Sequence, residues 1–107
     1  MAPGSIPVMV VVFYQHGCPA CDEYLPRFKR IAARYDRCVP VLYVDLGKSE
    51  HENLIAKFGP RFTPATVVWR PPSWRRPEGV RSWESAMPDS SIEGLFQLAA
   101  RAAACEV

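Results

Sequence analysis

Residues 8–21 read VMVVVFYQHGCPAC. The first part of this stretch, residues 8–14, is continuously apolar and rich in valine, which is typical of a strand buried on both faces of its sheet. Gly17 ends the apolar run, and two cysteines with two residues between them, Cys18 and Cys21, follow at once. We therefore expect a buried strand, a turn, and a C-x-x-C motif at the start of a helix.

The residues after the motif predict a helix from about Pro19 to Tyr35. Proline is tolerated in a first helical turn, and the acidic residues Asp22 and Glu23 suit a helix N-terminus. Apolar side chains recur at helical spacing further along, namely Tyr24, Leu25, Phe28, Ile31, Ala32 and Tyr35. Pro26 falls inside this stripe and should kink the helix, because proline removes one backbone hydrogen bond.

The rest of the chain predicts three more strands and two more helices. The apolar stretches that indicate strands are 39–46, 65–70 and 80–84, the last of which would return antiparallel to the one before it. Two capping-box patterns, Ser49 with Glu52 and Ser90 with Glu93, indicate where the helices begin. Gly59 is a typical helix stop.

The predicted order of elements is βαβαββα. Alternating strands and helices favour a parallel sheet with right-handed crossovers, and the late hairpin adds an antiparallel edge. The expected fold class is α/β, with a four-stranded mixed sheet flanked by helices. A chain of 107 residues is long enough for one domain and not two. We expect a single domain over residues 1–107, with its core at about 8–104.

Composition excludes several classes of protein. A net charge of +2 gives no strong attraction to nucleic acid or to a membrane surface, and no apolar run approaches the roughly 20 residues that span a bilayer. No Lys or Arg precedes the apolar residues 6–14, unlike in a secretory signal, and four cysteines are few for a disulfide-dense scaffold. We therefore expect a cytoplasmic protein, in which C-x-x-C is catalytic or metal-binding.

Four features together resemble the thioredoxin-like superfamily. The strand runs directly into Cys18-Pro19-Ala20-Cys21, Pro26 stands where thioredoxins carry a kink proline, and Tyr43-Val44-Asp45 ends the next strand. The most specific feature is the segment KFGPRFTPA over 57–65, which is similar to the thioredoxin segment Lys-Tyr-Gly-Ile-Arg-Gly-Ile-Pro-Thr. By this match Pro64 is the cis-proline that faces the C-x-x-C motif. The minimal βαβαββα layout is closer to that of glutaredoxins.

The chain departs from both families at positions that matter for proton transfer and for glutathione. Val12 stands where thioredoxins have a buried Asp, and His16-Gly17 replaces the usual Trp before the motif. The glutaredoxin segment that binds glutathione corresponds to residues 85–90, which contain no Gly-Gly. Thr63, just before the proline, is similar to the residue at this position in bacterial disulfide isomerases.

The resemblance implies a thiol–disulfide oxidoreductase that acts on protein or small-thiol disulfides. Cys18 would be the nucleophile, because free N–H groups and the dipole at a helix N-terminus favour a thiolate. Cys21 would resolve the mixed disulfide, and Thr63 with Pro64 would form the substrate platform by pairing with an extended segment. We expect no cofactor beyond the Cys18–Cys21 disulfide, and a protein disulfide or dithiol as the partner.

A metal site is the main alternative for the Cys18–Cys21 pair. Zinc would need two more ligands. The other cysteines and histidines lack finger-like spacing: they are Cys38, Cys105, His16 and His51. We therefore favour redox chemistry and expect no metal.

Other residues have a functional and a plain interpretation. His16 is either a substrate contact or proton carrier near Cys18, or a solvent-exposed turn histidine. Asp45 at the end of a strand is interpreted as a turn residue. Cys38 and Cys105 are expected to be structural or incidental.

A second hypothesis places the chain in a different functional class. It would be a binding or assembly module with a thioredoxin-like fold and no essential redox role, consistent with the missing Asp and the missing Gly-Gly. Its partner surface would be the loop 71–79, where Trp74, Arg75 and Arg76 would contact an acidic partner. The plain alternative is a solvated loop with one packed tryptophan.

Overall fold

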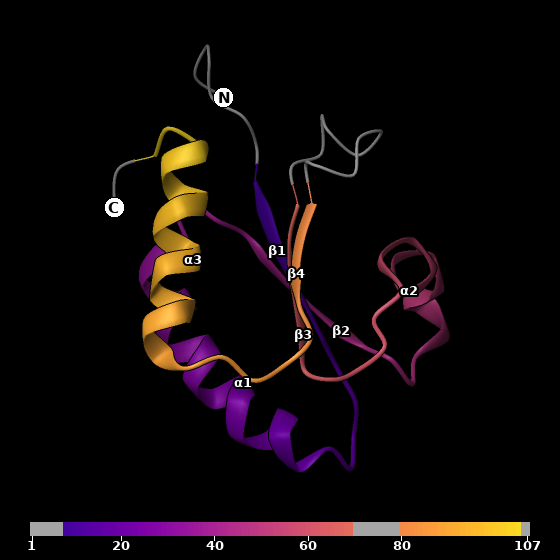
Figure 1. Ribbon diagram of the computed structural model, residues 1–107. Helices are drawn as coiled ribbons and strands as arrows, with labels where there is room; N and C mark the ends of the chain where they lie inside the picture. Colours follow the sequence, from indigo (N-terminus) through magenta and orange to yellow (C-terminus); the bar gives the residue numbers. More distant parts are fainter. Residues whose placement is uncertain (1–7, 70–79, 106–107) are drawn as a thin grey trace.

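The strand β1 (Met9–Tyr14) lies inside a four-stranded sheet of order β2-β1-β3-β4. The computed structural model describes residues 8–69 and 80–105. The other elements are α1 (Pro19–Ala32), η1 (Ala33–Tyr35), β2 (Val41–Asp45), η2 (Ser49–His51), α2 (Glu52–Phe58), β3 (Ala65–Trp69), β4 (Val80–Trp83) and α3 (Asp89–Ala102). Helices α1 and α3 cover one face of the sheet and α2 covers the other (Figure 1). The expected α/β class, a mixed four-stranded sheet flanked by helices, is confirmed.

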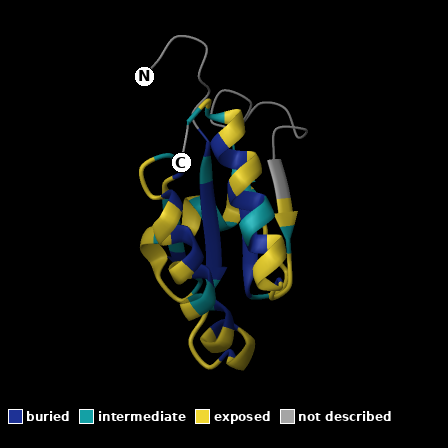
Figure 2. Ribbon diagram, turned by 90° about the vertical axis from the view of Figure 1, so that its left-hand side faces the viewer, coloured by how far each residue is buried: buried dark blue, intermediate teal, exposed yellow. Residues whose placement is uncertain are grey.

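Both faces of β1 are buried, as the apolar run predicted. Figure 2 shows this central strand almost entirely in the colour of buried residues. Val10 and Val12 belong to the cluster beneath α1 and α3, whereas Val11 and Phe13 belong to the cluster on the α2 side. The strand is therefore held from two sides, and the turn that follows it starts from a rigid support.

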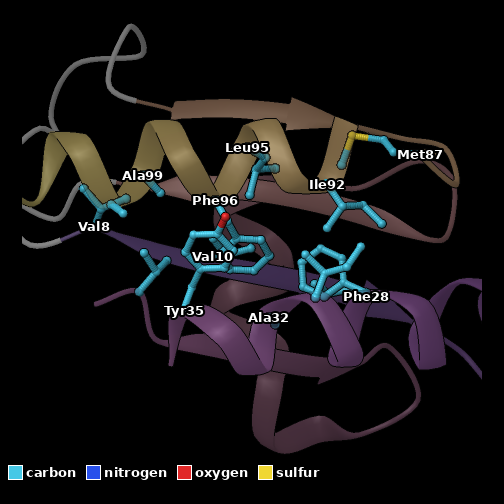
Figure 3. Packing of buried hydrophobic residues seen from close by; sticks show 14 of the residues in the cluster. Val8, Val10, Phe28, Ala32, Tyr35, Met87, Ile92, Leu95, Phe96 and Ala99 are labelled. Carbon is cyan, nitrogen blue, oxygen red and sulfur yellow. The ribbon is translucent and has the colours of Figure 1, made fainter. Parts of the chain in front are cut away.

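The larger core lies between the sheet and the pair α1 and α3 (Figure 3). Its centre is aromatic: the ring centroids of Phe28 and Phe96 are 5.3 Å apart, and Tyr35 stacks on Phe96 at 5.2 Å. Full burial of such a side chain contributes about 1.5–3 kcal/mol. Because Phe28 lies on α1, this packing fixes the helix whose N-terminus carries the C-x-x-C motif.

Helix α1 begins at Pro19, as the sequence predicts, and continues past Pro26 to Ala32. The short 3-10 helix η1 then extends the helical path to Tyr35. The expected strands also lie within two residues of their predicted bounds. None of the helices in the described part of the chain is long and apolar enough to cross a membrane.

The direction of β3 differs from the expectation. β2 pairs with β1 in parallel, but β3 pairs with β1 antiparallel, so the predicted parallel arrangement of this strand is wrong. The chain re-enters the sheet near the end at which β2 left it, since Asp45 at the end of β2 lies opposite Tyr14 and β3 starts at the same end of β1. The register pairs Ala65 with Phe13, which brings the start of β3 beside the end of β1.

The two predicted capping boxes are also wrong. No side-chain cap is made at the start of η2, α2 or α3. The first helical turn begins at Ser49 itself, and α3 begins at Asp89 directly after Pro88, so neither Ser49 nor Ser90 occupies a cap position. The Gly59 stop is confirmed, since Gly59 ends α2 with a left-handed φ of 54°.

Candidate functional site

The turn after β1 delivers Cys18 to the first turn of α1. Gly17 has a φ of 78°, a conformation that glycine adopts without steric cost. Cys18 is the N-cap residue, and its sulfur accepts a hydrogen bond from the backbone N–H of Cys21 at 3.1 Å. The carbonyl oxygen of Cys18 accepts from the N–H of Asp22 at 3.0 Å. The sulfur thus lies where free helical N–H groups favour a thiolate.

Cys18 and Cys21 form a disulfide, with their Cα atoms 5.2 Å apart. The two residues differ in accessibility. Cys18 is 9% exposed and Cys21 is 1% exposed. Cys18 is therefore the cysteine of the pair that keeps some contact with solvent, whereas Cys21 is enclosed by the protein.

The segment before β3 faces the disulfide. The Thr63–Pro64 peptide bond is cis, and Pro64 is buried. The carbonyl oxygen of Thr63 lies 3.7 Å from Cys18 Sγ, and its hydroxyl donates to the same sulfur at 3.5 Å. The hydroxyl oxygen accepts in turn from Gln15 Nε2 at 3.1 Å. The structure therefore places Thr63, the residue before the cis-proline, beside Cys18.

The surface around Cys18 includes apolar side chains. Pro19 and Ala20 are exposed on the first turn of α1. Phe62, just before Thr63, is 68% exposed, which is unusual for a large aromatic residue. Exposed apolar residues therefore stand next in sequence to Cys18 and to Thr63, which contacts Cys18.

His16 lies in the same turn and reaches the end of β2. Its Nε2 is 3.1 Å from Asp45 Oδ2, and the side chains are 86% and 4% exposed respectively. Asp45 Oδ1 also accepts from the N–H of Gly47 at 2.8 Å, so the turn role expected for Asp45 is present. The pairing with His16 was not foreseen, because the two residues are far apart in the sequence and meet only through the parallel pairing of β1 and β2.

A family model described as TraF, F plasmid transfer operon protein, matches residues 8–79. The chain belongs to the TraF family. A search of curated proteins finds no match to it.

Solved structures of thioredoxins share the fold of this TraF-family chain. Thioredoxin-2 of the malaria parasite is 19% identical, covers 87% of this chain and 84% of its own, and has a TM-score of 0.69. The germline-specific thioredoxin Deadhead of Drosophila melanogaster is 23% identical, with coverages of 86% and 80% and a TM-score of 0.69. A Malassezia sympodialis thioredoxin is 19% identical, with coverages of 91% and 78% and a TM-score of 0.71. The thioredoxin-like fold that the resemblance implied is thereby confirmed.

The position of the thioredoxin acid is apolar in this TraF-family chain. Val12 is fully buried in β1 and lies opposite Thr66 in β3. The hydroxyl of Tyr24 is 2.9 Å from Thr66 Oγ1, and burial raises the pKa of Tyr24 to about 12. This neighbourhood therefore holds a neutral hydroxyl pair. Among the described residues, Asp45 is the only buried carboxylate.

The TraF-family chain has a second disulfide, which joins Cys38 to Cys105 with a Cα–Cα distance of 5.6 Å. Cys38 follows η1, and Cys105 follows α3. The interpretation of these cysteines as structural or incidental did not foresee that they pair with each other. The signal available in the sequence was the even number of cysteines, which leaves Cys38 and Cys105 as a possible pair once Cys18 and Cys21 are paired. Connectivity cannot be deduced from spacing alone, however.

Two further sequence hypotheses concern metals and the long loop. Within residues 8–69 and 80–105 there is no group of three His, Cys, Asp or Glu side chains that could hold a metal ion. His51 lies at the start of α2.

Trp74, Arg75 and Arg76, the proposed partner surface, lie outside the described residues.

Proposed function

We propose that this TraF-family chain is a thiol–disulfide oxidoreductase that exchanges its Cys18–Cys21 pair with a protein disulfide or dithiol. The observation that carries the proposal is the unequal exposure of the two cysteines, 9% for Cys18 and 1% for Cys21. An incoming disulfide reaches Cys18, and Cys21 is held close enough to bond to it. This division is what a nucleophile and a resolving thiol require.

The exchange proceeds in two displacements. In the reduced protein, the Cys18 thiolate attacks one sulfur of the substrate disulfide, whose S–S bond breaks and whose other sulfur leaves as a thiolate. The Cys21 thiolate then attacks Cys18 Sγ, forms the Cys18–Cys21 disulfide and releases the second substrate thiolate. Two electrons pass from the protein dithiol to the substrate. The reverse sequence oxidises a substrate dithiol.

The backbone beside the cis-proline supplies the substrate platform in this proposal. An extended substrate segment would pair with the backbone at Thr63, next to the accessible sulfur, while Pro64 keeps a side-chain donor away from it. The exposed ring of Phe62 would cover an apolar side chain of that segment. His16, exposed in the turn before Cys18, stays our candidate for a further substrate contact.

The test is a dithiol–disulfide exchange assay on a protein disulfide with matched serine variants. Cys18→Ser should abolish exchange. Cys21→Ser should accumulate a mixed disulfide at Cys18, visible as a mass increase that a reductant removes. Equal exchange rates in wild type and Cys18→Ser would overturn the proposal. If Cys18 and Cys21 never cycle across a redox titration, the binding-module hypothesis replaces it.

The second cysteine pair bears on the compartment in which this exchange takes place. The cytoplasmic placement expected from the sequence stays a prediction. The Cys38–Cys105 disulfide favours an oxidising compartment instead, because the cytosol keeps most thiols reduced. Rapid thiol alkylation of intact cells, followed by mass analysis, separates the two: Cys38 and Cys105 are alkylated in a reducing compartment and protected in an oxidising one.

A further inference from the structure

A chain of two side-chain hydrogen bonds ends on the accessible sulfur. Gln15 Nε2 donates to Thr63 Oγ1 at 3.1 Å, and Thr63 Oγ1 donates to Cys18 Sγ at 3.5 Å. The three residues come from the turn after β1, the segment before β3 and the start of α1. Gln15 does not take part in the exchange mechanism proposed above, and no sequence motif marks it.

The direction of the second bond depends on the first. A threonine hydroxyl has one hydrogen to donate and two acceptor sites. The amide nitrogen of Gln15 carries only hydrogens, so it occupies an acceptor site on Thr63 Oγ1. The hydroxyl hydrogen is then left to point at another acceptor, and Cys18 Sγ is the acceptor within reach.

We propose that Gln15 is a positioning residue, which holds the Thr63 hydroxyl as a donor to Cys18 Sγ and so stabilises the Cys18 thiolate. This inference deepens the proposed function and rests on it, because thiolate character is useful only if Cys18 attacks disulfides. The other donor to the sulfur, the backbone N–H of Cys21, is present in any helix of this kind. The Thr63 hydroxyl is a rotor, so its contribution requires a neighbour that sets its orientation.

The surroundings of the two residues make them suitable for substitution. Gln15 is exposed and Thr63 is half-buried, so neither contributes a large apolar surface to the core. A change at Gln15 should leave the fold intact. Partial exposure also limits the effect, since water competes for the same hydroxyl.

The decisive variant is Gln15→Glu, which keeps the shape but replaces the donating nitrogen with a carboxylate oxygen. The carboxylate accepts the Thr63 hydroxyl hydrogen and turns it away from the sulfur. We expect the midpoint of the pH dependence of Cys18 alkylation by iodoacetamide to rise by about 0.5–1 pH unit. Gln15→Ala, which removes the donor and leaves the hydroxyl free to rotate, should give a smaller rise.

A double-mutant cycle removes the effect of the added negative charge. Thr63→Val keeps the β-branched shape without a hydroxyl, so in that background Gln15→Glu acts on Cys18 through charge alone. The proposal is supported if Gln15→Glu raises the alkylation midpoint more in the protein with Thr63 than in the Thr63→Val variant. Equal shifts in the two backgrounds overturn it.

The double-mutant cycle tests the role of Gln15, and the exchange assay tests the proposed function, so one can be refuted without the other. The cycle reads the Cys18 thiolate in the reduced protein, without any disulfide substrate. Exchange that persists in a protein whose cycle shows no coupling refutes the role of Gln15 alone. Absence of exchange in wild type refutes the proposed function, whatever the alkylation midpoints are.

Discussion

Cys38 and Cys105 are 67 positions apart in the sequence and form a disulfide that ties the segment before β2 to the residue that follows the last turn of α3. Cys38 packs against the larger core, and the backbone N–H of Cys105 donates to the carbonyl oxygen of Ala100 at 3.0 Å. The bond therefore fastens α3, which covers one face of the sheet, at its C-terminal end.

Removal of this disulfide should destabilise the protein. In the chain-entropy model, cross-linking a loop of this length restricts the unfolded chain and contributes roughly 4 kcal/mol to the free energy of unfolding. We expect Cys38→Ser/Cys105→Ser to lose about that amount in urea denaturation. The matched variant Cys18→Ser/Cys21→Ser, whose sequence separation is 3, should lose less because its loop is short. Free thiols at Cys38 and Cys105 in the non-reduced protein would contradict the assignment.

The fold could be predicted from the sequence wherever local pattern determines structure. The valine-rich strand, the helix after Cys21 and the Gly59 stop each depend on neighbouring residues. The position of Pro64 opposite the motif came from the resemblance to thioredoxins. The direction of β3 could not be read from an alternation of elements, because the connection over residues 46–64 is long enough to return the chain to either end of the sheet.

The polar contacts around the site could not be predicted for a related reason. Gln15 meets Thr63 across 48 positions of sequence, and His16 meets Asp45 only because β1 and β2 are parallel neighbours. Neither pair has a spacing signature. The capping-box patterns show the opposite error: the residues were present at the right spacing, but the helical turns begin at other positions.

The two partners of the His16–Asp45 pair should contribute unequally to stability. His16 is mostly exposed, and exposed ion pairs contribute less than about 1 kcal/mol, so His16→Ala should change the free energy of unfolding by less than that. Asp45 is buried and also accepts from the N–H of Gly47, so Asp45→Ala should cost about 1–3 kcal/mol. Asp45→Asn keeps one carbonyl acceptor and should fall between them. Equal losses for His16→Ala and Asp45→Ala in urea denaturation would show that this account is wrong.

The buried Tyr24–Thr66 pair predicts a specific loss of stability at alkaline pH. Burial raises the pKa of Tyr24 to about 12 in the folded protein, above the unfolded value of about 10. The contribution of the neutral phenol is therefore fully present below pH 10 and is lost as the pH rises toward 12.

Tyr24→Phe removes this titration. At neutral pH the variant should be less stable by about 1–2 kcal/mol, because the Thr66 hydroxyl loses its partner. The difference from wild type should narrow above about pH 10 when unfolding is measured at a series of pH values. Burial also raises the pKa of Tyr43. Tyr43→Phe therefore serves as a comparison, which shows how the free energy of unfolding changes at alkaline pH when another buried tyrosine is removed. Parallel curves for wild type and Tyr24→Phe would contradict the prediction.

Arg27 connects α1 to the start of α3 through several acceptors. It bonds both carboxylate oxygens of Glu23, at 2.6 and 3.0 Å, and donates to Asp89 Oδ1 at 2.7 Å and to the carbonyl oxygen of Met87 at 3.0 Å. Its hydrogen bonds hold the pKa values of Glu23 and Asp89 below their usual range.

Replacement of Arg27 should therefore have a pH-dependent cost. Because both carboxyl pKa values are lowered on folding, their contribution is present above the unfolded values of about 4 and is lost as the pH falls through the folded ones. Arg27→Met keeps the aliphatic stem and should be less stable than wild type at neutral pH, with a difference that shrinks on acidification. Arg37→Met, at an exposed position with no ion pair among the residues described, serves as the control and should show no such trend. Urea unfolding at pH values from about 2 to 7 measures both, and a difference for Arg27→Met that stays constant over this range would exclude the carboxylates as its cause.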